Sequence, residues 1–195
     1  MNNVEFFDTI APRWDKTNII NEKKISHILD VAEVGEGDSV LDVGTGTGVL
    51  IPFLESRIGT GGRIEAVDLS EGMLDVARGK YSGYSNLAFK RLDVETDTID
   101  EQFDHIMMYC MFPHLQDPID TLRWLVNVNL RPGGTLVIAH AQSRHAINNI
   151  HHRHSPDGTD NLVEIEFFVS LIREHGMKVD YSEDSDEYYI VRIRA

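Results

Sequence analysis

The sequence predicts a doubly wound α/β fold with a mainly parallel, seven-stranded sheet. Five apolar runs of strand length lie between residues 39 and 140, and segments with a helical period separate them. Such continuous apolar strands are typical of a parallel sheet that has helices on both faces. Two more strand-like runs near the C-terminus are close enough in sequence to form an antiparallel hairpin.

Each element can be placed from its pattern. The parallel strands are expected at residues 39–44, 63–68, 87–93, 103–109 and 134–140. The helices between them are expected at 47–58, 70–81 and 117–130, with turn signals such as GTGG and RPGG at their boundaries. A later helix, 162–175, should end at Gly176 in a left-handed conformation, followed by hairpin strands at 177–182 and 186–194.

Length and composition limit the classes of protein. The 195 residues fit a single domain over 1–195, with residues 1–35 as an N-terminal helical cap and 36–195 as the core. A net charge of −14 opposes binding to nucleic acid, so a small-molecule partner is expected. One cysteine excludes an internal disulfide, and no signal peptide or bilayer-spanning run is evident. We therefore expect a cytoplasmic monomer or homodimer without a membrane partner.

The segment VLDVGTGTGVL forms a glycine-rich turn from the first strand into a helix, with Gly44, Gly46 and Gly48 at the turn. Glycines let a ligand approach the backbone closely, and nucleotide-binding loops use the same device. Two details argue against a dinucleotide. Asp42 would repel a pyrophosphate but suits a ligand with an amine and a sulfonium, and Val49 stands where the dinucleotide fingerprint needs its third glycine.

Two further acids end the neighbouring strands. Asp68 follows the glycine loop by about 20 residues, where an acid can accept both ribose hydroxyls of an adenosine, and Asp93 ends the third strand. Aspartates at strand ends are also ordinary turn formers. Because the carboxyl ends of parallel strands line one crevice, however, three such acids beside a glycine loop favour a ligand site.

These motifs together resemble those of class I S-adenosylmethionine-dependent methyltransferases. VLDVGTGTGVL, IEAVDLSEGML, LAFKRLDVET, FDHIMMYCMFPHLQDP and LRPGGTLVIAH match that family in order and spacing over about residues 38 to 140. FFDTIAPRWD resembles the N-terminal segment of the small-molecule enzymes related to the ubiquinone and menaquinone methyltransferases, where it helps to cap the cofactor. The resemblance implies transfer of a methyl group from S-adenosylmethionine to a small soluble acceptor by in-line displacement, which leaves S-adenosylhomocysteine.

The resemblance also implies a set of cofactor residues. The glycines would border the methionine moiety, Asp68 would hold the ribose, and Leu69 with Met73 would flank the adenine. Asp93 and Val94 would read the edge of the adenine, and Tyr109 would lie beside the cofactor. The full set is Asp42, Gly44, Thr45, Gly46, Gly48, Asp68, Leu69, Met73, Asp93, Val94 and Tyr109.

The acceptor side is expected after the fourth and fifth strands, where the family places its acceptor pocket. YCMFPH lacks the Asn/Asp-Pro-Pro-aromatic motif of nucleobase and glutamine amino methyltransferases. The candidate catalytic residues are Tyr109, His114 and His140, and Trp14 and Cys110 are candidates for the acceptor pocket. Cys110 is also open to a simpler interpretation, because a free cysteine is most often a small buried hydrophobic residue.

A histidine-rich stretch, VIAHAQSRHAINNIHHRH, follows the fifth strand. A helix that Ser143 could cap would place Arg144, Asn148 and His151 on one face, a set that suits an anionic acceptor. The histidines of three segments, His114, His140 and His151, could instead form an open divalent metal site that lowers the pKa of a bound thiol or hydroxyl. The final HHRH is also typical of a solvated helix end.

Two other functions remain as alternatives. A non-catalytic protein that senses S-adenosylmethionine or a metal could use the histidine stretch as its reporter. An NAD-dependent oxidoreductase is the weaker alternative, because Asp42 and Val49 oppose it. The residues leave open whether the methylated atom would be O, N, S or C.

Overall fold

The computed structural model describes residues 3–17, 20–154 and 161–195 of the chain. It contains one seven-stranded sheet with the order β3-β2-β1-β4-β5-β7-β6. Strand β7 is antiparallel to both β5 and β6, and the remaining pairs are parallel. The strands are β1 (Ser39–Val43), β2 (Arg63–Asp68), β3 (Leu87–Arg91), β4 (Phe103–Tyr109), β5 (Leu130–His140), β6 (Lys178–Asp184) and β7 (Tyr189–Arg194). The predicted fold class is confirmed.

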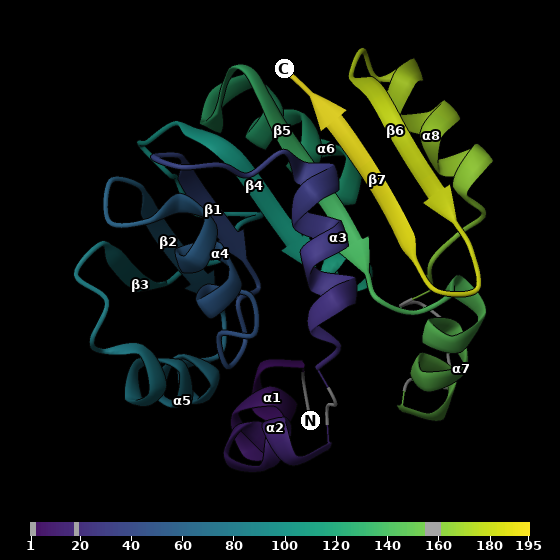
Figure 1. The fold of residues 1–195 in the computed structure, drawn as a ribbon. Helices are drawn as coiled ribbons and strands as arrows, with labels where there is room; N and C mark the ends of the chain where they lie inside the picture. The colour runs from purple at the N-terminus through teal and green to yellow at the C-terminus, as the bar shows by residue number, and fades with distance from the viewer. Residues whose placement is uncertain (1–2, 18–19, 155–160) are drawn as a thin grey trace.

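Helices cover both faces of this sheet (Figure 1). One apolar core lies between the sheet and the helices α3 and α4, and the other between the sheet and α6, α7 and α8. The α-helices are α1 (Asn3–Ile10), α2 (Trp14–Thr17), α3 (Glu22–Ala32), α4 (Ile51–Ile58), α5 (Glu71–Tyr81), α6 (Pro118–Trp124), α7 (Arg144–His154) and α8 (Ile165–Glu174). Figure 1 places α1 and α2 below the ends of the central strands.

Local sequence explains how α3 forms. The Asn21 side chain caps the helix by accepting a hydrogen bond from the Lys24 amide at 3.2 Å. Ile25, Ile28 and Leu29 repeat at helical spacing and are fully buried against the sheet. Glu33 ends the helix with a left-handed φ of 65°. Helix α3 is therefore a fixed part of the core.

Most predicted boundaries agree with the structure to within a few residues, and three differ for physical reasons. The helix expected from residue 47 begins at Ile51, because the glycine loop occupies the preceding residues. The helix expected over 117–130 is α6 followed by a π-helical turn, η3 (Leu125–Asn129). Strand β5 begins at Leu130 rather than 134, with an irregular register against β4 near its start.

Gly176 has the predicted left-handed conformation, with a φ of 80°. The Met177 amide also donates to the Ile172 carbonyl at 3.3 Å, as expected after a helix that ends in this way.

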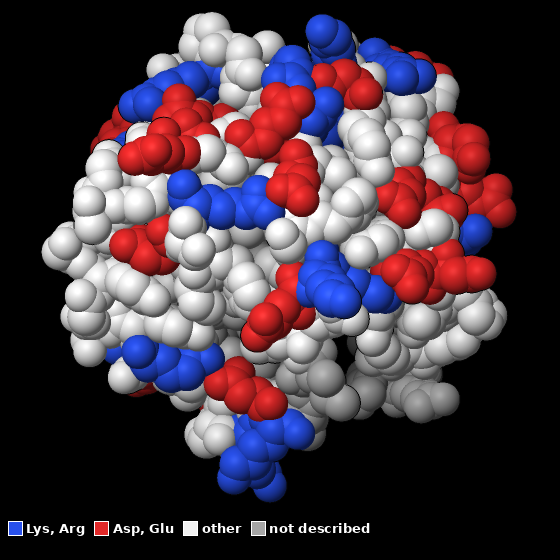
Figure 2. Space-filling model, in the orientation of Figure 1, with Lys and Arg blue, Asp and Glu red and all other residues white. Residues whose placement is uncertain are grey.

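The surface has no single dominant charge on the face shown in Figure 2, where acidic and basic side chains lie side by side. Several of these pairs join distant segments. Arg192 donates to Glu33 beyond α3 and to Asp180 on β6, at 2.7 and 2.8 Å. Within the described ranges 3–17, 20–154 and 161–195, no helix reaches the length and apolarity that a bilayer span requires.

Candidate functional site

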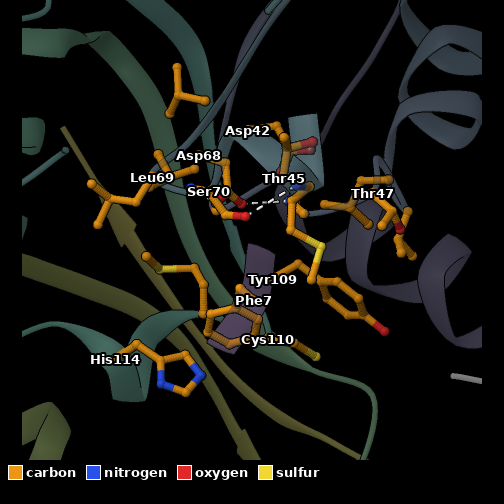
Figure 3. A pocket seen from close by; sticks show the side chains of 18 of the residues that line it. Phe7, Asp42, Thr45, Thr47, Asp68, Leu69, Ser70, Tyr109, Cys110 and His114 are labelled. Carbon is orange, nitrogen blue, oxygen red and sulfur yellow. Dashed lines mark hydrogen bonds between the residues drawn. The ribbon is translucent and has the colours of Figure 1, made fainter. Parts of the chain in front are cut away.

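A cavity of about 530 Å³ lies at the carboxyl ends of the parallel strands, between the sheet and the α1–α2 segment (Figure 3). This volume is within the range of about 300–1,000 Å³ for small-molecule sites. The lining residues come from α1, α2, the glycine loop, the ends of β1 to β5, α5, η2 (Phe112–His114) and α7. The structure thus brings together segments from most of the chain's length.

The glycine loop forms one wall of the cavity. The amides of Gly44 and Thr45 donate to the Val67 carbonyl at 2.9 and 3.0 Å, which ties the loop to β2. Gly44 and Gly46 have left-handed φ angles of 68° and 56°, which glycine adopts without strain. A Cβ atom on Gly46 would meet nothing within 4 Å, so this backbone faces open space.

Asp68 ends β2 and holds the loop in place. Its carboxylate accepts hydrogen bonds from the Gly46 amide at 2.8 Å and from the Ser70 amide at 2.9 Å (Figure 3). Burial raises the pKa of Asp68, while these two amides oppose the shift. A carboxylate has about four lone-pair positions, so Asp68 can accept further hydrogen bonds from a ligand.

Asp42 lies deeper in the same wall, with only 1% of its surface exposed. Its carboxylate accepts a hydrogen bond from the Thr45 hydroxyl at 2.7 Å. Burial raises the pKa of Asp42 to about 7, and the neighbouring Asp68 charge adds to the rise. A cationic ligand group near this carboxylate would favour its ionised form.

The other residues predicted to contact the cofactor divide into two groups. Leu69, Met73, Asp93 and Val94 line the cavity, as do Asp42, Gly44, Thr45, Gly46, Asp68 and Tyr109. Gly48 is not among the lining residues. A Cβ atom there would come within 2.7 Å of the Ile51 and Tyr81 side chains, so Gly48 allows close packing behind the loop.

An aromatic cluster forms the opposite wall. His114 belongs to the short helix η2 (Phe112–His114), and its ring lies 5.4 Å from that of Phe7 in an edge-to-face arrangement. The Phe7 ring also contacts the Trp14 ring, with centroids 5.7 Å apart. His114, Phe7 and Trp14 all line the cavity, and Figure 3 shows Phe7 and His114 near Cys110.

Cys110 directly follows β4 and turns the chain into this wall with a left-handed φ of 56°. It presents accessible surface to the cavity, although protein surrounds it. Burial raises the pKa of its thiol to about 11, so the thiol stays protonated at neutral pH. The neighbouring Tyr109 has a raised pKa for the same reason.

The histidine-rich stretch lies mostly away from the cavity. His140 is 1% exposed and lies edge-on to the Tyr189 ring, with centroids 6.3 Å apart. Because side chains alternate along a strand, Ala141 rather than His140 lines the cavity. This corrects the expectation that His140 faces the cleft.

Two residues of the predicted acceptor face anchor α7 instead of lining the cavity. The Arg144 guanidinium donates to Asp184 on β6 at 2.9 Å, with Glu164 at 3.8 Å. The Asn148 side chain bonds both the amide and the carbonyl of Leu162 at 2.9 Å. The side chain of His151 lies outside the part of the structure that is described.

No group of three or more His, Cys, Asp or Glu side chains within the described residues could hold a metal ion. The site expected from His114, His140 and His151 includes a side chain outside the described residues, so this search does not test it. His114 lines the cavity, whereas His140 is buried beside β7.

The sequence prediction missed several lining residues. Phe7 and Ser70 had local signals, since Phe7 belongs to FFDTIAPRWD and Ser70 caps α5 by accepting from the Met73 amide. The others had no signal beyond neighbouring a strand end or a helix. The missed set is Val4, Phe7, Ile20, Asn21, Val43, Thr47, Val49, Leu50, Val67, Ser70, Leu92, Glu95, Met111, Leu115, Ala141, Gln142 and Ile150.

Comparison with known families identifies the class of site. Residues 40–134 match the family model described as a methyltransferase domain. The predicted methyltransferase resemblance is confirmed. The matched residues include the glycine loop, Asp42, Asp68, Asp93 and His114.

Individual proteins support the same class. A demethylmenaquinone methyltransferase of Clavibacter sepedonicus is 30% identical over 139 residues, which cover 68% of this chain and 55% of that protein. A malonyl-[acyl-carrier protein] O-methyltransferase of Acetivibrio thermocellus is 29% identical over 135 residues, covering 68% and 47%. The chain spans about half the length of these curated relatives.

A solved structure matches over almost the whole chain. The crystal structure of a SAM-dependent methyltransferase from Aquifex aeolicus has a TM-score of 0.73 and 25% identity, and it covers 94% of this chain and 97% of that chain. The likeness therefore extends beyond residues 40–134.

Proposed function

We propose that this protein transfers a methyl group from S-adenosylmethionine to a small acceptor and releases S-adenosylhomocysteine. The observation that carries the proposal is the charge of the cavity. Four carboxylates line it, and the lining residues within the described ranges include no lysine or arginine. The carboxylates are Asp42, Asp68, Asp93 and Glu95.

This charge favours S-adenosylmethionine over a dinucleotide. A sulfonium and an ammonium group are attracted by carboxylates, whereas a pyrophosphate is repelled. The residues fit the cofactor in other respects. The Gly46 backbone faces open space, and Asp68 keeps free acceptor capacity for ribose hydroxyls.

When bound, S-adenosylmethionine supplies an electrophilic methyl group on its sulfonium. The protein's own contribution is alignment and exclusion of water, which can account for much of the rate of an in-line displacement. Phe7, Trp14 and Met111 supply apolar surface for this purpose. His114 carries the one imidazole among the described lining residues. We assign it the role of the general base that takes the proton from the acceptor.

The acceptor side of the cavity favours a neutral molecule. Its walls are mainly apolar, with His114, Asn21 and Gln142 as polar groups. Arg144, which would have suited an anionic acceptor, is paired with Asp184 instead. The two curated relatives carry names with different acceptors, so the names alone do not select one.

Titration of the purified protein tests the proposal. We expect S-adenosylmethionine and S-adenosylhomocysteine to bind and NAD not to bind. Asp68→Ala should weaken binding at least about tenfold, or about 1.4 kcal/mol, through loss of the ribose hydrogen bonds. Asp100→Ala, which changes an exposed carboxylate away from the cavity, is the matched control.

Two outcomes would contradict the proposal. Binding of NAD, or an unchanged affinity in Asp68→Ala, would refute the cofactor assignment. Binding of S-adenosylmethionine with no S-adenosylhomocysteine formed from a broad panel of thiols, phenols and amines would favour the non-catalytic sensor. A metal ion, a cytoplasmic location, a single domain and a monomeric or homodimeric state stay predictions, and metal analysis of the purified protein tests the first.

A further inference from the structure

The α1–α2 segment forms part of the cavity wall and is held in place by two carboxylates. Val4, Phe7 and Trp14 from this segment line the cavity. Asp8 and Asp15, from the same segment, do not line it but bond to the residues around it. The segment from residue 3 to residue 17, which we term the lid, therefore covers the site and contacts its frame.

Asp8 joins the lid to the start of α5. Its carboxylate accepts hydrogen bonds from the Ser70 hydroxyl at 2.6 Å and from the Gly72 amide at 2.9 Å. The Ser70 amide in turn donates to Asp68 at 2.9 Å. Ser70 thus connects Asp8 of the lid to Asp68, the carboxylate that is proposed to hold the ribose.

The packing at this contact is close. A Cβ atom on Gly72 would lie 3.0 Å from the Asp8 Cα and 3.1 Å from the Asp8 carbonyl oxygen. These distances are tighter than ordinary van der Waals contact, and the nearest neighbours are backbone atoms. A side chain at position 72 would therefore push the lid away from α5.

Asp15 joins the lid to the glycine loop and to the last turn of α5. Its carboxylate accepts from the Thr47 hydroxyl at 2.5 Å and from the Lys80 ammonium at 2.8 Å. Thr47 is fully buried in the glycine loop, and Lys80 belongs to α5. The second contact thus connects the lid to the loop that borders the cofactor.

Both carboxylates are stabilised in their charged form. The bonds from Ser70 and Gly72 lower the pKa of Asp8. Burial acts against ionisation of Asp15, but the bonds from Lys80 and Thr47 outweigh it and lower the pKa. Hydrogen bonds to charged groups are stronger than those between neutral groups, so the two contacts can hold a short helical segment.

We propose that Asp8 and Asp15 are positioning residues that latch the lid over the cofactor, and that cofactor exchange requires both latches to open. This inference rests on the proposed function, because the exchanged molecule is S-adenosylmethionine or its product. Each latch bonds a residue next to a proposed cofactor contact. Asp8 bonds Ser70, which donates to Asp68. Asp15 bonds Thr47, which follows Gly46 in the chain. Opening the lid therefore also loosens the frame of the cofactor site.

The main test measures how fast S-adenosylhomocysteine leaves the protein. Asp8→Ala and Asp15→Ala should each raise its dissociation rate constant about tenfold in stopped-flow displacement, since each removes hydrogen bonds to a charged group. The KM for S-adenosylmethionine should rise, while kcat should not fall in proportion, because neither side chain lines the cavity. Unchanged dissociation in both variants would overturn the proposal.

A pair of glycine variants separates latching from stability. Gly72 and Gly79 both lie in α5, where alanine is the better helix former, but a Cβ atom on Gly79 would meet nothing within 4 Å. Gly72→Ala should speed S-adenosylhomocysteine dissociation and Gly79→Ala should not. Equal dissociation rates in the two variants would contradict the close lid contact.

Hydrogen exchange in the ligand-free protein gives a readout that does not depend on the proposed function. Amides of residues 3–17 should exchange faster than in the wild type in Asp8→Ala, Asp15→Ala and Gly72→Ala. Their exchange rates should stay unchanged in Gly79→Ala. If the wild type fails to bind S-adenosylhomocysteine, the proposed function is wrong, but this measurement still decides whether the two carboxylates hold the lid. Unchanged exchange in Asp8→Ala and Asp15→Ala would refute the latches.

Discussion

The two halves of the cavity are built in different ways. The cofactor half consists of strand ends and a loop whose main-chain amides are fixed by hydrogen bonds, such as those from Gly46 to Asp68 and from Gly44 to Val67. The acceptor half consists of side chains from the lid, η2 and α7 that meet through apolar and ring contacts, such as Phe7 with His114. The sheet therefore determines the first half, and packing between separate segments determines the second.

The largest expected effect comes from a glycine at which the halves meet. Gly44→Ala should destabilise the protein by about 2–5 kcal/mol, because a left-handed residue acquires a Cβ and the core is overpacked. That Cβ would lie 2.6 Å from the Met111 Cβ, which belongs to the acceptor half. Urea unfolding measures the loss of stability.

The matched variant is Gly46→Ala, whose Cβ would meet nothing within 4 Å. Only the left-handed backbone then costs free energy, about 1–2 kcal/mol. If the two variants lose equal stability, the contact between Gly44 and Met111 does not join the halves as the structure indicates.

The next effect concerns the acceptor half alone. His114→Gln should lower kcat by about a hundredfold or more, the usual contribution of a general base. Its affinity for S-adenosylmethionine should change little, because the hydrogen-bonded cofactor half stays intact. His145→Gln, an exposed histidine on α7, is the control. Full turnover in His114→Gln would rule out His114 as the general base.

A third prediction uses the buried charge of the cofactor half. The pKa of Asp42 is raised from 3.8 to about 7, so the folded state binds more protons than the unfolded state between these values. The stability contributed by protonated Asp42 is therefore lost as the pH rises from about 4 to about 7. Asp42→Asn should make this slope shallower, gaining about 1–3 kcal/mol of stability relative to the wild type between about pH 5 and pH 8.

Urea unfolding across this pH range measures the slope. An equally steep slope in Asp42→Asn would assign the titration to another group. The cofactor half also contains Asp68, whose pKa is raised by burial, so part of the slope should remain in the variant.

The smallest effect is expected at Arg144. Its ion pair with Asp184 is partly exposed, with side chains 33% and 23% accessible. Arg144→Gln should cost less than about 1 kcal/mol of stability, as is usual for such pairs. It should leave kcat unchanged for a neutral acceptor. A large loss of turnover would restore Arg144 to the acceptor site and show that α7 approaches the acceptor more closely than the structure indicates.

Much of the cofactor half could be predicted from sequence for a physical reason. Asp42, Gly44, Gly46 and Asp68 all lie within or directly after strands, and parallel strands place their carboxyl ends on one edge. Neighbours in sequence are therefore neighbours in the site. Gly48 belongs to the same glycine loop but serves packing, because its left-handed backbone lies against the Ile51 and Tyr81 side chains.

The acceptor half could be predicted less well. The helical spacing predicted that Arg144, Asn148 and His151 share one face of the helix now seen as α7, but could not show which element that face meets. In the structure, β6 and the segment at Leu162 take up the first two residues. Likewise, ending a strand did not place His140 in the cavity, since strand alternation put its side chain on the sheet face where it packs beside Tyr189 of β7.

The sequence by itself determined the strands, the glycine turn, the three strand-end acids and the resemblance to class I methyltransferases. Each of these depends on local pattern and on the rule that parallel strands end at the same edge. The tertiary structure alone decided which side chains of the predicted N-terminal cap meet that edge, and where they bond. Asp8, Phe7 and Asp15 belong to the site region through contacts with residues 30 to more than 100 positions away, such as Thr47, Ser70 and His114. Such contacts depend on how helices pack across the sheet, which local patterns do not encode.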